Sequence, residues 1–281
     1  MIFAIFVDNL MEKELKRKLK KVLTDSIRHF FKRKLEEGVS TSNILDILFP
    51  QERRIRSLIG GLETSMGTTV WEVIARELAI NNGFEIIPDK QILIPEPFPN
   101  ELNLTLQKLI NSRSNGHLVS TDECIAQLRQ ASLNIERDNL SFVAPPKGMG
   151  IDLYLKKNVI EYIFDLKSSQ ANVGDFSRYN RQLLHWYAYR FAKDPTVQLK
   201  ARIAFTFNHF KKDWYKKQKN KIATHLDPDS DIFVENEFWD FCSGYKNTSG
   251  IFMSLFKELR DENFHEEFHD IFYESLNNIS D

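Results

Sequence analysis

The chain has 281 residues, of which 42% are hydrophobic and 12% aromatic, and its 38 Lys and Arg residues nearly balance 39 Asp and Glu residues. A chain of this length and apolar content can bury a full core, which excludes a disordered protein. The formal net charge of −1 excludes a uniformly basic DNA coat protein, whose affinity depends on excess Lys and Arg. The two cysteines form no paired motif, and no apolar stretch is long enough to span a membrane, so a cytoplasmic protein is expected.

The N-terminal third is predicted to be helical. Apolar residues recur at helical spacing through the Lys-rich residues 11–36, which predicts an amphipathic helix. Its basic face is either solvated or in contact with a DNA backbone or a partner. Gly60-Gly61 predicts a break, followed by a second helix that begins near Gly67 and ends at Gly83, a residue typical of a helix C-terminus.

Strands and helices are mixed along the rest of the chain without regular βαβ repetition. This mixture predicts an α/β fold with a mixed central sheet flanked by helices. In chain order, the expected elements are a strand within 84–99, helices over 100–135 with a loop at 112–116, a hairpin of 150–156 and 159–167, a helix over 175–193, strands at 201–207 and 232–234, and helices in the last forty residues.

The predicted hairpin carries three charged side chains that converge at one edge of the sheet. Asp165 and Lys167 are two residues apart in a strand and therefore point to the same face. A turn centred near residue 157 makes Asp152 a diagonal neighbour of Asp165. Two carboxylates this close repel each other unless a cation lies between them, and Mg²⁺ takes one or two carboxylates together with phosphate oxygens. The alternative is an exposed hairpin with an ordinary Asp–Lys ion pair; the apolar Ile163-Phe164 before Asp165 favours the metal site.

At these residues the chain resembles the PD-(D/E)XK nuclease superfamily and, within it, the TdeIII-type type II restriction endonucleases. The likeness covers residues 53–244, and it departs from the superfamily pattern at Ile151, which stands where proline is common. The segments that carry it are Arg54–Glu72, the hairpin with Asp152, Asp165 and Lys167, Gly174–Tyr189, Ala201–Phe205, Lys211–Tyr215 and Val234–Gly244.

The resemblance implies a restriction-endonuclease-like fold with extra N- and C-terminal helices. It also implies Mg²⁺-dependent hydrolysis of phosphodiester bonds in double-stranded DNA at a short palindromic site, such as a GGNCC-like one. By this likeness Asp152, Asp165 and the Leu166 carbonyl would hold the metal, and Lys167 would act on the water. A palindrome is most easily read by a homodimer. A cognate DNA methyltransferase is the functional partner of such an enzyme. The alternatives with the same fold are a DNA repair or junction nuclease and a DNA-binding module.

Glu72 is the accessory catalytic acid that the resemblance implies. On a helical wheel Glu72 and Arg76 lie away from the apolar side formed by Val70 and Ile74. An i,i+4 ion pair between Glu72 and Arg76 is therefore the alternative interpretation. Glu63 is the second candidate for the accessory acid.

Two segments are candidates for contacts with DNA. Arg178, Arg181 and Gln182 share one stripe of the helix that follows Lys167, a position that favours phosphate or base contacts over a merely solvated face. Arg pairs with guanine and Gln with adenine in the major groove. Lys211 and Lys212 begin a Lys-rich segment that either follows a phosphate backbone or forms a plain surface loop.

A competing motif lies near the C-terminus. His265-Glu266-Glu267-Phe268-His269 fits the HExxH pattern, in which two His one turn apart bind Zn²⁺ and the Glu acts as base. Phe264 and Phe268 belong to an apolar stripe, so an amphipathic helix is the simpler explanation. A zinc metalloprotease is the distant alternative.

Charge is segregated along the chain. Residues 258–281 carry eight acids and one arginine, a net charge of −7 that leaves +6 on residues 1–257. We expect a single nuclease domain over 1–281, with a helical N-terminal extension (1–52), a core (53–244) and an acidic C-terminal segment (245–281). We expect basic residues along the sides of a cleft and an acidic surface on the opposite side of the protein.

Overall fold

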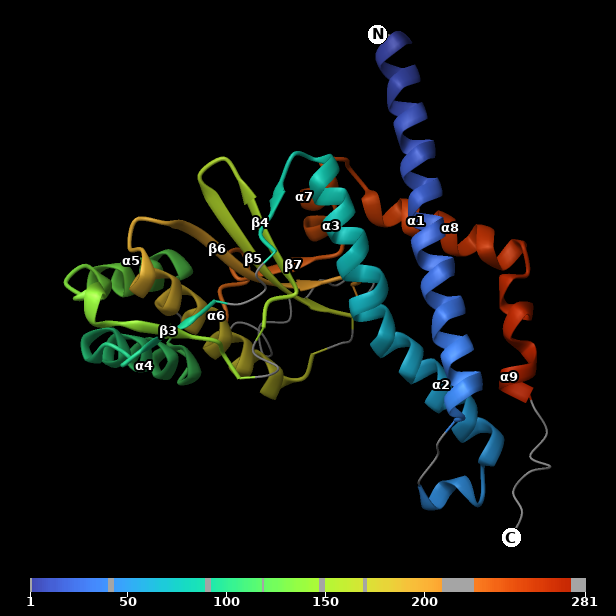
Figure 1. The fold of residues 1–281 in the computed structure, drawn as a ribbon, viewed down its shortest axis with the longest axis horizontal. Helices are drawn as coiled ribbons and strands as arrows, with labels where there is room; N and C mark the ends of the chain where they lie inside the picture. Colours follow the sequence, from blue (N-terminus) through green and yellow to red (C-terminus); the bar gives the residue numbers. More distant parts are fainter. Residues whose placement is uncertain are drawn as a thin grey trace. The chain divides into compact units, whose positions relative to one another are not determined.

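A mixed β-sheet flanked by helices forms one part of the fold, and a group of helices forms the other (Figure 1). The computed structural model describes residues 2–39, 43–88, 92–117, 119–146, 150–168, 171–208 and 225–273. The chain divides into a helical unit, residues 1–74 with 246–281, and a sheet unit, residues 75–245. The N-terminal extension and the acidic C-terminal segment therefore belong to one unit. The first boundary between the two units falls inside a helix at residue 74.

The sheet unit is built on five strands in the order β1-β4-β5-β6-β7. Neighbouring strands are antiparallel from β1 to β5 and parallel from β5 to β7, so the expected α/β fold with a mixed sheet is confirmed. The strands are β1 (Glu85–Ile86), β4 (Leu153–Lys157), β5 (Ile160–Lys167), β6 (Gln198–Phe205) and β7 (Ile232–Val234), and β2 (Ile94–Glu96) pairs with β3 (Ser141–Val143) outside this sheet.

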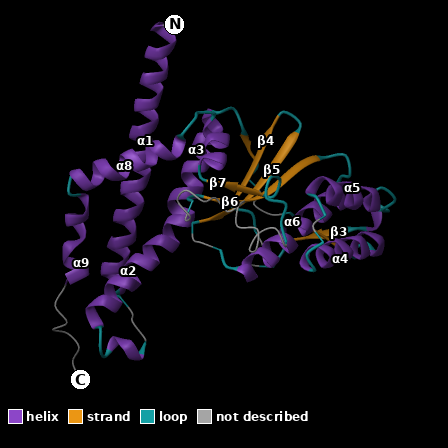
Figure 2. Ribbon diagram, turned by 180° about the vertical axis from the view of Figure 1, so that it is seen from behind, coloured by secondary structure: helices purple, strands orange, loops and turns teal. Residues whose placement is uncertain are grey.

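Helices cover both faces of the five-stranded sheet, as Figure 2 also shows. Inward residues such as Ile163 and Ile203 share a core with Leu183 on one face, and Phe164 contacts Phe238 on the other, at 5.3 Å between ring centres. The helices of the first face are α4 (Asn100–Ser114), α5 (Thr121–Ser132) and α6 (Val173–Lys193), α7 (Asn236–Ser243) covers the second, and the short η3 (Arg137–Asn139) follows α5.

The predicted hairpin is confirmed, but its register differs from the expected one. Leu153 pairs with Phe164, and continuing this register places Asp152 directly opposite Asp165, not diagonally. The reason is the turn. It is made by Asn158 and Val159, with Asn158 in the left-handed region at φ 56°, so its centre lies beyond residue 157.

The helical unit contains α1 (Ile2–Glu37), η1 (Ile44–Asp46), α2 (Pro50–Met66), η2 (Gly67–Trp71), α8 (Thr248–Asp261), η5 (Phe264–Phe268) and α9 (His269–Tyr273). The apolar stripe predicted for α1 is buried at Leu19, Leu23 and Phe30, so its amphipathic pattern is confirmed. None of the described helices is long and apolar enough to cross a membrane.

The predicted break at Gly60-Gly61 is wrong, because both glycines lie inside α2. A Cβ at Gly61 would lie 3.2 Å from the ring of Phe30, so the missing side chain lets α1 approach α2 closely. The π-helical η2 then leads directly into α3 (Glu72–Asn81). The predicted end at Gly83 is confirmed: Gly83 has φ 77°, and the Phe84 N–H donates to the Ala79 carbonyl.

The basic helix α1 and the acidic C-terminal segment form ion pairs with each other. This contact corrects the expectation that the acidic segment lies apart from the basic segments. Lys16 and Lys20 both contact Glu258, at 2.8 and 2.7 Å. Arg28 donates two hydrogen bonds to Glu267, each at 2.7 Å. Much of the opposite charge that the sequence separates is therefore neutralised locally within the helical unit.

Candidate active site

The two hairpin carboxylates meet where β4 begins and β5 ends. Asp165 is only 6% exposed, and Asp152 is half-buried. The Leu166 N–H donates to Oδ2 of Asp152 at 2.7 Å, which fixes the Asp152 carboxylate beside the end of β5. Since β5 and β6 are parallel, this is the carboxyl edge of the parallel strands, where α/β proteins usually bind ligands.

Lys167 lies beside this pair. Its Nζ donates to Oδ1 of Asp165 at 2.6 Å and lies 5.8 Å from the centre of the Tyr179 ring. Tyr179 belongs to α6 and is buried, so the aromatic ring forms a wall next to the ammonium group. The predicted convergence of Asp152, Asp165 and Lys167 is therefore present in the fold.

The site favours a positive charge. Burial raises the pKa of Asp165 to about 6; the ammonium of Lys167 acts in the opposite direction, and the neighbouring carboxylate of Asp152 adds to the rise. A proton or a second cation would relieve the repulsion between the two carboxylates.

The donor set suits Mg²⁺. This ion binds through one or two carboxylates and keeps several waters, so Asp152, Asp165 and the Leu166 carbonyl are the groups that would hold it. No group of three or more His, Cys, Asp or Glu side chains is arranged for metal binding within the described ranges.

The helix α6 presents part of the predicted DNA-binding stripe. Asn172 caps its N-terminus through a reciprocal pair of hydrogen bonds with Asp175. Arg178 is exposed and bonded to Asp175 at 3.0 Å, Arg181 is exposed, and Gln182 is half-buried. These three side chains are therefore accessible to a ligand in different degrees. Lys211 and Lys212 lie outside the described residues.

Glu72 lies in the first turn of α3, in the helical unit. It is 7% exposed, so its side chain is buried although the helical wheel places it away from Val70 and Ile74. The π-helical turn before it adds a residue to the helical repeat and changes the face on which Glu72 emerges. Glu63 is exposed on α2. Their accessory role stays a prediction.

The HExxH pattern does not form one regular α-helix. Residues 264–268 are a 3₁₀ helix, and α9 begins only at His269. His265 contacts Glu266 at 3.1 Å, and both histidines are largely exposed. Since 3₁₀ spacing does not stack residues i and i+4, this geometry disfavours a zinc protease.

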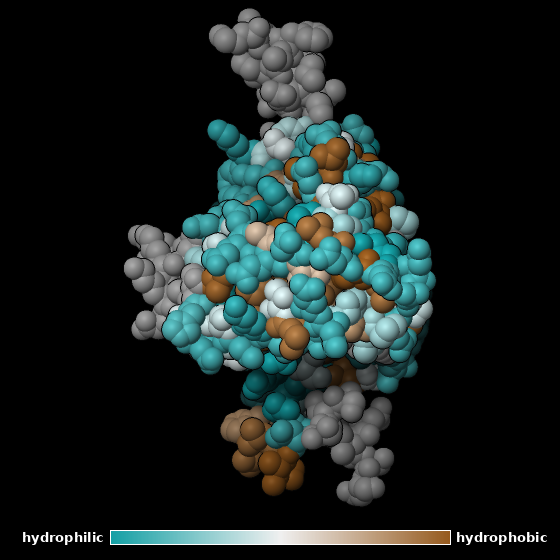
Figure 3. All heavy atoms as spheres, turned by 90° about the vertical axis from the view of Figure 1, so that its left-hand side faces the viewer, coloured by the Kyte–Doolittle hydropathy of each residue, from teal (hydrophilic) through white to brown (hydrophobic). Residues whose placement is uncertain are grey.

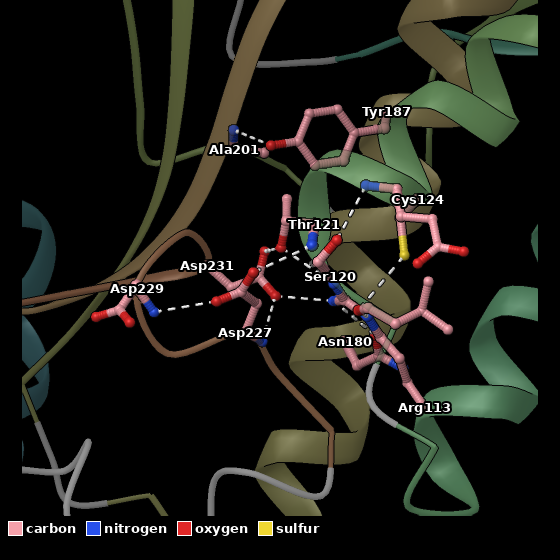
Figure 4. A network of polar contacts seen from close by, with 12 residues as sticks. Arg113, Ser120, Thr121, Cys124, Asn180, Tyr187, Ala201, Asp227, Asp229 and Asp231 are labelled. Carbon is pink, nitrogen blue, oxygen red and sulfur yellow. Dashed lines mark hydrogen bonds and ion pairs between the residues drawn. The ribbon is translucent and has the colours of Figure 1, made fainter.

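A buried polar cluster beside the parallel strands was not predicted from the sequence. Figure 4 shows Arg113, Thr121 and Asp231 pointing toward one another. Arg113 donates to Asp231 at 2.8 Å and to Thr121 at 3.0 Å, and Asn180 of α6 lies at 3.5 Å from Arg113. The cluster joins α4, α5 and α6 to the turn before β7. These residues are far apart in sequence, so no local sequence pattern predicts this cluster.

The comparison with known proteins agrees with this geometry. A model of the family described as "Type II restriction endonuclease, HinfI" matches residues 8–275. The searches of curated proteins and of solved structures found no match. The family match extends at both ends beyond residues 53–244, the range of the expected likeness. It does not show the narrower TdeIII-type assignment. It covers nearly the whole chain, and the chain therefore belongs to the HinfI family of type II restriction endonucleases, the site-specific deoxyribonucleases of restriction-modification systems.

Proposed function

We propose that the enzyme hydrolyses double-stranded DNA with Mg²⁺ at a short palindromic site, and that Asp152, Asp165 and Lys167 form its active site. The observation that carries this proposal is the buried carboxylate of Asp165, held 2.6 Å from the Lys167 ammonium at the edge of the parallel strands. A DNA-cutting enzyme needs negative ligands for a metal and a positive group near the phosphate in the same place.

Each of these groups of the chain would have its own role in the reaction. Asp152 and Asp165, with the Leu166 carbonyl, would hold the ion. When bound, Mg²⁺ lowers the pKa of a coordinated water and polarises a phosphoryl oxygen. Lys167 would orient the attacking water or neutralise charge on the phosphate. The water oxygen would bond to phosphorus while the bond to the 3′ oxygen breaks, which leaves a 5′-phosphate and a 3′-hydroxyl.

Several finer properties belong to the same proposal. Two copies would cut the two strands of a palindrome, each at one active site. Arg178, Arg181 and Gln182 would contact DNA from α6, together with Lys211 and Lys212. Glu72 would assist catalysis, and both units would serve one nuclease.

The TdeIII-type likeness supports a GGNCC-like target as the first sequence to test. A cognate DNA methyltransferase would protect the same sites in the cytoplasm.

A plasmid digest tests the proposal. The purified protein is incubated with a plasmid of known sequence in Mg²⁺ or in EDTA, and the fragment ends are sequenced. Discrete fragments with one shared palindrome at their ends support it, and they should disappear in EDTA. A smear would instead indicate a non-specific nuclease of the same fold, and intact DNA in Mg²⁺ would contradict the proposal.

A further inference from the structure

The helical unit exposes a run of large apolar side chains just before α2. In this apolar turn, defined as Ile44, Leu45, Ile47, Leu48 and Phe49, the exposed fractions are 80%, 45%, 81%, 70% and 50%. In Figure 3, apolar spheres gather in the lower part of the view, where Figure 1 draws the segment before α2. Monomeric proteins rarely expose a contiguous apolar patch of this kind, and such patches usually mark an interaction site.

The apolar turn is held in a defined conformation. Asn43 and Asp46 form a reciprocal capping pair around η1, in which the Asn43 N–H donates to Asp46 at 2.6 Å and the Leu45 N–H donates to Asn43 at 3.0 Å. The Arg53 Nε of α2 donates to Asp46 at 2.9 Å. A surface that is ordered before binding loses less conformational entropy when a partner covers it.

The charge on the apolar turn indicates the kind of partner. Residues 43–50 contain no Lys or Arg, so this surface lacks the cations that a DNA phosphate requires. Its single charge, Asp46, is neutralised by Arg53. A two-fold contact brings the same patch of each copy together, and like charges there would repel. An apolar patch without net charge can meet its own copy without that repulsion.

The area of the apolar turn is also sufficient. A fully exposed large apolar residue offers roughly 200 Å², so these exposed fractions leave on the order of 600 Å² per copy. Two copies would bury about 1,200 Å², which is the lower limit of a specific, stable interface.

We propose that the apolar turn is the centre of a two-fold interface with a second copy of this chain. This inference rests on the proposed cleavage of a palindrome, which needs two active sites, and it locates the surface that brings two copies together. Ile47 and Leu48 would be the central contacts, because they are among the most exposed apolar side chains of the turn.

Sedimentation of the full chain tests this interface without any DNA. The wild-type protein should sediment as a dimer at micromolar concentration. The double variant Ile47→Glu/Leu48→Glu should raise the dimer dissociation constant at least about 30-fold, because the loss of central contacts and the repulsion between two acidic patches both weaken it. Both side chains are exposed, so the variant chain should still fold, with a far-UV circular dichroism spectrum like that of the wild type.

The matched control is Leu104→Glu, which places one such charge on a leucine of α4 that is 71% exposed. This variant should remain dimeric. A monomeric wild type, or a double variant that sediments like the wild type, overturns the proposed interface. Plasmid cleavage is measured separately. If the wild type forms a dimer that the double substitution dissociates, but this dimer never cuts DNA, the proposed function is refuted and the proposed interface stands.

Discussion

At the scale of single residues, the edge of β4 and β5 explains how two carboxylates remain close in the resting enzyme. The Leu166 N–H binds Asp152, and the Lys167 ammonium binds Asp165. Each carboxylate therefore has a donor before any substrate arrives, and a repulsive pair becomes a stable arrangement. The period of two in a strand was enough to predict that Asp165 and Lys167 share a face. The exact position of Asp152 was not predictable, because it depends on the left-handed Asn158 in the turn.

Removing the Lys167 ammonium should reduce the cleavage rate by a factor of about 10² to 10³, the usual effect of losing one group that stabilises developing charge. Lys167→Ala should otherwise fold like the wild type, because the Lys167 side chain is partly exposed. Single-turnover cleavage of a plasmid measures this effect. Lys200→Ala is the matched control, because Lys200 is an exposed lysine on the neighbouring β6. Equal rates for the two variants would remove Lys167 from the proposed site.

Glu72→Gln should lower the cleavage rate about 10-fold or more while preserving the fold, because Gln keeps the shape of this buried side chain and removes its charge. Glu63→Gln, a change at the exposed second candidate on α2, should leave the rate unchanged. The two rates are compared at saturating Mg²⁺ on the same plasmid. The opposite order would assign the accessory role to Glu63.

At the scale of elements, long-range packing determines the structure at the places where local sequence patterns gave a wrong prediction. Gly60-Gly61 resembles a helix break, yet α2 continues through it because Phe30 of α1 packs against Gly61. The helical period in α1 predicted its buried face well. The contact between α1 and the acidic C-terminal helices was not predictable, because its partners lie more than 200 residues apart.

The pairing of α1 with α8 should make the helical unit sensitive to acid. The hydrogen bonds from Lys16 and Lys20 lower the pKa of Glu258 to about 2, from an ordinary value near 4.5. A lowered pKa means that the pair stabilises the fold above about pH 4.5, and that this contribution is lost as pH falls toward about 2. Each of these side chains is about one third exposed, so water still screens the contact, and its contribution is about 0.5 kcal/mol.

Thermal unfolding of Glu258→Gln beside the wild type measures this contribution. The difference in melting midpoint should be largest near neutral pH and should vanish at the acid end. Glu101→Gln, a change at an exposed acid of α4, serves as the control. A difference for Glu258→Gln that does not depend on pH would contradict the assigned ion pair.

The buried cluster around Arg113 should be important for the stability of the sheet unit. Arg113→Met leaves Asp231, which is 1% exposed, without its cationic partner, and this should cost about 3–5 kcal/mol of unfolding free energy. The double variant Arg113→Met/Asp231→Asn removes both charges and should recover part of that loss. Denaturant unfolding measures both values. A loss below about 1 kcal/mol for the single variant would show that the cluster contributes little.

At the scale of the whole molecule, the net charge of −1 hides an internal pairing. Acids near the C-terminus meet cations of α1 within the helical unit, while the carboxylate pair of the candidate active site lies in the sheet unit. Composition predicted a folded protein, the mixture of strands and helices predicted the α/β fold, and the residues of the hairpin predicted that two carboxylates and a lysine converge. The division into two units was not predictable, because it joins the two ends of the chain.

The most direct test of this account is cleavage of one plasmid, in Mg²⁺ and in EDTA, by the wild type and by Asp165→Asn, with sequencing of every fragment end. The account predicts that the wild type cuts only in Mg²⁺, at one palindromic sequence, and leaves 5′-phosphates. It predicts that Asp165→Asn stays folded and leaves the plasmid intact. Cleavage by Asp165→Asn at the wild-type rate, or by the wild type in EDTA, would contradict the central claim.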